Sequence, residues 1–122
     1  MIAALILAGF GVAAEPPLPP ELQAYYFCVA NRADSLVEDE PARAPAQIAA
    51  SAIGACAPLR ATAVSATVRL MLADPAVRGW ARERQMSEEE LMRSGEIEFD
   101  AALHERLLRN IAELRAAAGA RE

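Results

Sequence analysis

The chain contains no lysine, a single histidine and only two cysteines among its 122 residues. A zinc site takes about four closely placed ligands, which His104 and two widely separated cysteines do not provide. The sequence also lacks a Gly-x-Ser-x-Gly motif and a glycine-rich phosphate-binding loop, so no motif supports a hydrolase or a nucleotide-binding enzyme. We therefore predict no catalytic residue, no metal and no cofactor.

The charge of the chain is acidic. Every basic side chain is an arginine, and the 12 arginines are outnumbered by 17 acidic residues, which gives a formal charge of -5 and a pI near 4.9. Proteins that bind nucleic acid neutralise phosphates with clustered basic side chains. We therefore expect no nucleic-acid partner, and the length of the chain favours a single domain.

The first fourteen residues, MIAALILAGFGVAA, are apolar and end in small side chains, and the proline-rich stretch EPPLPPEL follows them. This order is typical of a secretory signal cleaved before Glu15, here without the usual basic residues at its start. Fourteen residues are fewer than the roughly 20 that span a bilayer as a helix. We expect export to the periplasm or beyond and no membrane span after cleavage, with a retained anchor as the alternative.

The sequence also lacks the period-two alternation of half-buried strands and the dipeptides of tight hairpin turns, so an all-α fold is predicted. Apolar residues at helical spacing predict a first helix over residues 22–39. A second helix should open at Pro45, kink near Ala57 because of Pro58, and continue to residue 73.

Two further starts are marked by capping residues. Asp74 before a proline predicts a short helix from residue 75, and Ser87 with Glu90 forms a capping-box pattern. Regularity weakens around Gly95, so the last long helix is expected from about residue 97 or 100 to 118. The prediction is a small helical bundle over residues 22–118, with a signal at 1–14, an extended arm at 15–21 and a frayed tail at 119–122.

The two cysteines fall at matching heights in the first two predicted helices. Cys28 precedes the end of the first helix by about eleven residues, and Cys56 follows the start of the second by about eleven, or roughly 16 Å from the turn in each case. An antiparallel helical hairpin would bring the two sulfurs together, and export favours their oxidation. We predict a structural disulfide; two free thiols and a metal site are the alternatives, while a Cys-x-x-Cys redox pair is missing.

Two segments within residues 22–60, YYFCVANRAD and PAQIAASAIGACAPLR, resemble a group of small exported, all-helical proteins of alphaproteobacteria that carry a single cysteine pair. The resemblance implies export and a helical fold, and it implies no activity. A looser analogy of size, compartment and single bridge connects the chain to small helical periplasmic acid-stress chaperones, and such an analogy concerns the fold alone.

Phe27 falls on the polar side of the first predicted helix, so it either packs under another segment or is exposed in a binding patch. Together with Tyr25 and Tyr26 it forms the candidate interaction patch. The first hypothesis is a non-catalytic exported protein that binds a protein or an envelope component. The alternatives are a small envelope hydrolase or metal-dependent enzyme that uses His104, and a periplasmic acid-stress holdase chaperone.

Overall fold

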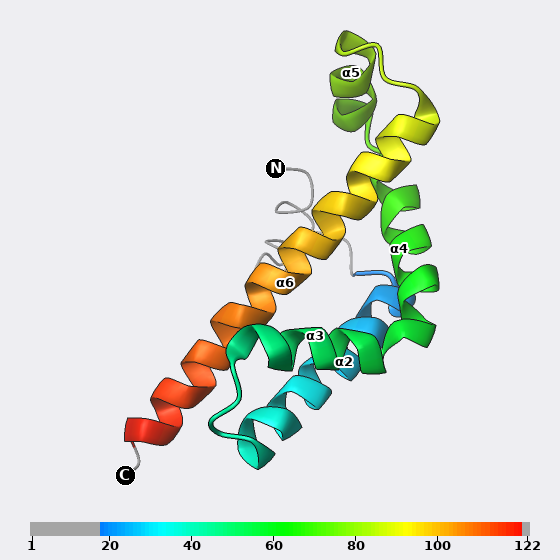
Figure 1. Cartoon of the computed structure of the whole chain (residues 1–122). Helices are drawn as coiled ribbons and strands as arrows, with labels where there is room; N and C mark the ends of the chain where they lie inside the picture. Colours follow the sequence, from blue (N-terminus) through cyan, green and yellow to red (C-terminus); the bar gives the residue numbers. More distant parts are fainter. Residues whose placement is uncertain (1–17, 121–122) are drawn as a thin grey trace.

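The computed structural model describes residues 18–120, and this range contains five helices and no strand. The helices are α2 (Pro20–Asp39), α3 (Pro45–Ala55), α4 (Ala57–Leu72), α5 (Pro75–Glu83) and α6 (Glu88–Ala120) (Figure 1). The predicted all-α bundle is confirmed. The predicted signal and residues 15–17 of the predicted arm lie outside the described residues, as do the last two residues of the predicted tail.

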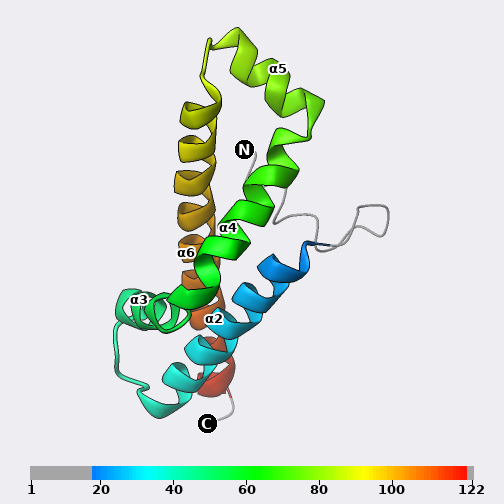
Figure 2. The same cartoon turned by 90° about the vertical axis from the view of Figure 1, so that its right-hand side faces the viewer.

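The longest helix, α6, extends along the whole molecule (Figure 1). The α2–α3 hairpin packs against the C-terminal half of α6, and α4 runs beside its N-terminal half (Figures 1 and 2). At the far end, α5 connects α4 to the start of α6. The molecule therefore has a compact end, built from four helices, and an arm built from α4, α5 and α6.

Two separate cores correspond to these two parts. The larger core joins α2, α3, the first half of α4 and the middle of α6, and its fully buried large side chains include Tyr25, Val29, Ile48 and Ile111. The smaller core lies under α5. It is formed by three buried residues and the partly buried side chains packed on them, namely Val77, Ala81, Leu91, Leu72, Trp80 and Met86.

The structure confirms the two helix starts that were predicted from capping residues, at Asp74 and Ser87. Asp74 accepts a hydrogen bond from the backbone N–H of Ala76 at 2.9 Å, and Ser87 Oγ accepts one from the N–H of Glu90 at 3.1 Å. Each bond satisfies a donor at a helix N-terminus that has no partner inside the helix. These caps fix where α5 and α6 begin.

The predicted continuity of the second helix is wrong. α3 ends at Ala55 and α4 begins at Ala57, and the two helices are bent by 84°. Pro58 has no N–H for a helix interior and its ring clashes with the preceding turn, whereas the second position of a new helix needs no N–H partner. The backbone N–H of Cys56 donates to the carbonyl of Ile53, three residues earlier, at 3.2 Å, instead of to the carbonyl four residues earlier as in an α-helix. α3 therefore ends at this point, and the chain changes direction before α4 begins.

The predicted irregularity at Gly95 is also wrong, because α6 is one continuous helix from Glu88 to Ala120. Gly95 faces α4, where a Cβ would lie 3.2 Å from Met71 Cε and 3.7 Å from Val68 Cγ2. A glycine costs about 1 kcal/mol in a helix interior, and the close packing that it permits against α4 offsets this cost. The predicted boundaries shift accordingly, since α2 begins inside the predicted arm and α6 extends into the predicted tail.

Within the described range, no single helix has both the length and the apolar composition needed to cross a membrane. Only α3 and α4 taken together meet that test, on length and composition, across their bend.

Candidate binding groove

The predicted disulfide between Cys28 and Cys56 is present, with a Cα–Cα distance of 6.0 Å. It ties α2 to the bend between α3 and α4, and Cys56 is buried in the larger core. A covalent link at this place restrains the direction in which α4 leaves the compact end. We assign it a structural role, because both sulfurs are engaged with each other.

The structure divides the three residues of the predicted interaction patch. Tyr25 is fully buried, with its ring stacked on that of Phe99 at a centroid distance of 6.0 Å. Tyr26 is half-buried, with the guanidinium of Arg106 5.0 Å from its ring centroid. Phe27 is 62% exposed, which is one of the two outcomes predicted for it. A surface patch here therefore includes Phe27 and excludes Tyr25.

His104 is exposed on α6. Among residues 18–120, no group of three or more histidine, cysteine, aspartate or glutamate side chains is placed to hold a metal ion. His104 also makes no hydrogen bond or ion pair with another described residue. The structure therefore offers no positive support for the alternative in which this histidine acts in catalysis.

One feature that the sequence did not predict is an open groove of about 510 Å³ between α4 and α6. Its apolar floor is formed by Val64, Val68 and Leu72 of α4, and Met92 of α6 lies beside this floor. The three α4 residues recur every four positions, so they share one side of that helix. Met92 is 46% exposed, which leaves a flexible apolar side chain open to solvent beside the floor.

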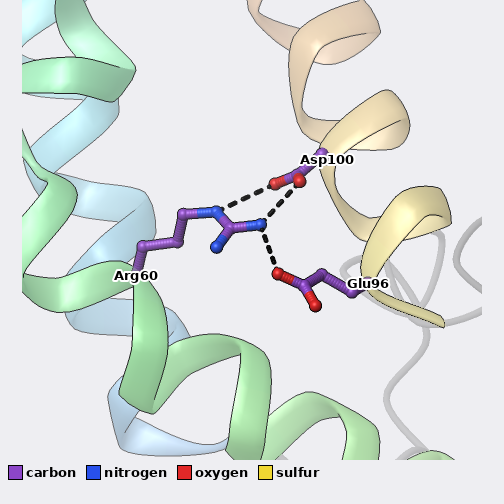
Figure 3. Close-up of polar contacts among 3 residues, drawn as sticks. All are labelled: Arg60, Glu96 and Asp100. Atoms are coloured by element: carbon purple, nitrogen blue, oxygen red, sulfur yellow. Dashed lines mark hydrogen bonds and ion pairs between the residues drawn. The ribbon is translucent and has the colours of Figure 1, made fainter. Parts of the chain in front are cut away.

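One end of the groove is closed by an ion-pair cluster that joins α4 to α6 (Figure 3). Arg60 Nε and Nη2 donate to the two carboxylate oxygens of Asp100 at 3.1 and 2.6 Å, and Nη2 also donates to Glu96 Oε1 at 2.9 Å. These hydrogen bonds, from Asp100 first and then Glu96, raise the pKa of Arg60 above its ordinary value. With one cation and two carboxylates, the cluster carries a formal charge of -1.

The opposite end of the groove carries a cation with no such partners. Arg69 lies on α4 near Leu72 and is exposed, and no hydrogen bond or ion pair joins its side chain to another residue within 18–120. Across the groove, Arg93 and Glu89 form an exposed pair on α6 at 3.6 Å, which contributes little to stability. The groove therefore has a negative end at Arg60 and an available positive charge at Arg69.

Tyr25 belongs to the larger core, and it lies close enough to Arg60 and Asp100 for their charges to affect its pKa. Its hydroxyl oxygen is buried and has no hydrogen-bond partner in the structure. Burial raises the pKa of Tyr25, the nearby charge of Arg60 opposes that increase, and the charge of Asp100 adds to it. The stacked rings of Tyr25 and Phe99 join α2 to α6 next to the ion-pair cluster.

The folded protein is expected to lose stability in alkali because of Tyr25. Its pKa in the folded state lies above the ordinary value of 10.0, so just above pH 10 the unfolded chain releases a proton that the folded chain keeps. The stability present below pH 10 is therefore lost as the pH rises through the folded-state pKa. Absorbance titration of tyrosinate should show a late transition that Tyr25→Phe removes and Tyr26→Phe retains. A latest transition that Tyr25→Phe leaves unchanged would contradict this burial.

The chain matches no protein-family model, no curated protein and no solved structure.

Proposed function

We propose that the protein is an exported, non-catalytic binding protein that attaches through its helical surface to a protein of the cell envelope. The disulfide supports the compartment in this proposal, because such bonds persist in oxidising environments outside the cytosol. The apolar opening run, typical of a secretory signal, supports it as well.

The observation that carries the binding role is the groove between α4 and α6. Its centre is apolar and its edges hold charges of both signs, which is the usual composition of a protein interface with an apolar core and a polar rim. An exposed methionine suits such a surface, because its unbranched side chain adapts to different partners. The groove is open along its length, and this favours an extended or helical segment over a small enclosed ligand.

Phe27 offers a second place for the same role. It is the most exposed aromatic side chain among the large apolar residues on the described surface, and it lies on the outer side of α2. Aromatic side chains are common anchors at interfaces, because they supply a large contact area. The groove and Phe27 lie on different helices and can be tested separately.

Cross-linking of the exported protein in an envelope extract, followed by affinity capture and quantitative mass spectrometry, tests this function. Met92→Glu places a charge beside the groove floor and is expected to reduce recovery of its specific partners about tenfold. Phe27→Glu tests the second surface in the same way. Ile97→Glu is the matched control, since Ile97 is 64% exposed on α6 and does not line the groove.

Loss of the same partners from Met92→Glu or Phe27→Glu, but not from Ile97→Glu, would support the proposal. Identical partner sets for the wild type and all three variants would overturn it. Circular dichroism of each variant shows whether the helical fold is retained, so that a loss of partners reflects the surface.

A further inference from the structure

We propose that the groove binds an amphipathic helix of the partner protein, with an apolar stripe on the floor and an acidic side chain paired with Arg69. This inference rests on the proposed function and specifies the chemistry of the partner. It is carried by the length of the groove, its apolar floor and the unequal charges at its two ends.

The dimensions of the groove suit a helix of about three turns. From Arg60 to Leu72, α4 rises by about 18 Å, since each residue adds about 1.5 Å. Figure 2 shows α2 packed against the lower part of α4 only, while α4 continues beside α6 toward α5. A helix laid over this stretch would add a third element to a pair that otherwise buries its apolar side chains incompletely.

The floor residues match the spacing of an incoming apolar stripe. Val64, Val68 and Leu72 present a row at four-residue intervals, and the side chains of a second helix at the same spacing pack between the members of such a row. Met92 lies across from this row and is still 46% exposed. Contact with an apolar side chain of the partner would remove Met92 from water.

The charges define which end of the partner helix is acidic. At one end, Arg60 is already bound by Glu96 and Asp100, and the excess carboxylate there repels a further acidic group. At the other end, Arg69 has no ion-pair partner among the described residues. An acidic side chain of the partner therefore belongs near Arg69 and Leu72, about 13 Å along α4 from Arg60.

Two synthetic peptides test this inference by fluorescence anisotropy. Both are amphipathic helices of about 14 residues with the same leucine stripe, long enough for the groove. The acidic peptide carries two glutamates at one end, and its twin carries two lysines at the same positions. The wild-type protein is expected to bind the acidic peptide at least about tenfold more tightly than the basic one, and high salt should reduce this difference.

Arg69→Glu is expected to reverse the preference between the two peptides. Arg32→Glu is the matched control, because Arg32 is exposed on α2 and the substitution changes the net charge by the same amount. Met92→Glu should weaken the binding of both peptides, because it places a charge beside the apolar floor. A reversal with Arg69→Glu and not with Arg32→Glu would support the inference.

Equal affinity of the wild type for the two peptides, no binding of either, or equal effects of Arg69→Glu and Arg32→Glu would each overturn the inference. The proposed function would survive that result if envelope partners were still lost from Met92→Glu or Phe27→Glu. Partner sets unchanged by both of those variants would overturn the proposed function instead, so the two failures are distinguishable.

Discussion

Replacement of Cys28 and Cys56 by alanine is expected to lower the free energy of unfolding by about 3 to 4 kcal/mol. The disulfide links residues 28 positions apart, so its loss restores conformational freedom mainly to the unfolded chain. A small domain is stable by only about 5–15 kcal/mol, so this loss is a large fraction of the total. Urea unfolding followed by circular dichroism gives the difference.

Reduction of the wild-type protein provides the control for this double variant. A reducing agent should lower the stability of the wild type by a similar amount and leave the Cys28→Ala/Cys56→Ala variant unchanged. A loss below about 1 kcal/mol would mean that the non-covalent core alone fixes the α3–α4 bend, contrary to the role assigned to the disulfide.

The second large effect is expected from Gly95→Leu, which should destabilise the protein by about 2 to 3 kcal/mol. Even a Cβ at this position would lie 3.2 Å from Met71 Cε, and the flexible end of that side chain can move away from a single methyl. The remaining atoms of a leucine have no such space and would push α6 away from α4. Thermal and urea unfolding measure the loss.

Gly79→Ala is the matched control for that substitution. A Cβ at Gly79, also inside a helix, meets no atom within 4 Å, so alanine there should raise stability by about 1 kcal/mol through helix propensity. Opposite signs for the two positions would support the close α4–α6 packing on which the groove depends. A neutral Gly95→Leu would contradict it.

The local parts of the fold could be predicted from the sequence. Asp74 and Ser87 cap helices through hydrogen bonds to residues at most three positions away. The residues that determine these helix starts are therefore neighbours in the sequence. The disulfide was predictable for a related reason. Two helices joined by a short turn have a fixed relation between sequence position and height, and this relation places Cys28 beside Cys56.

The errors came from contacts between distant residues. Gly95 weakens a helix by local propensity, but its role is decided by Met71 and Val68 on another helix. At Cys56, a kinked helix and an 84° bend differ in how α3 and α4 pack against α2, a helix that is distant in the sequence. Propensity is a weak guide wherever packing of this kind competes with it.

The groove could not be predicted, because it requires knowledge of which helices are neighbours. Arg60 and Asp100 are 40 positions apart in the sequence, and each residue taken alone is typical of an ordinary surface charge. A four-residue spacing such as that of Val64, Val68 and Leu72 is typical of one side of a helix, but it does not show what lies opposite that side. Tyr25 enters the core, while its two neighbours in sequence lie nearer the surface.

The separation of the two cores has a mechanical consequence. The smaller one contains only three buried side chains under α5, and no disulfide reaches it. Regions with few buried contacts open at a lower free energy than the rest of a domain. The tip of the arm can therefore open and reform while the compact end stays folded. If the groove binds the proposed helix, the end of the groove next to α5 could then change its packing around that helix without unfolding of the whole domain.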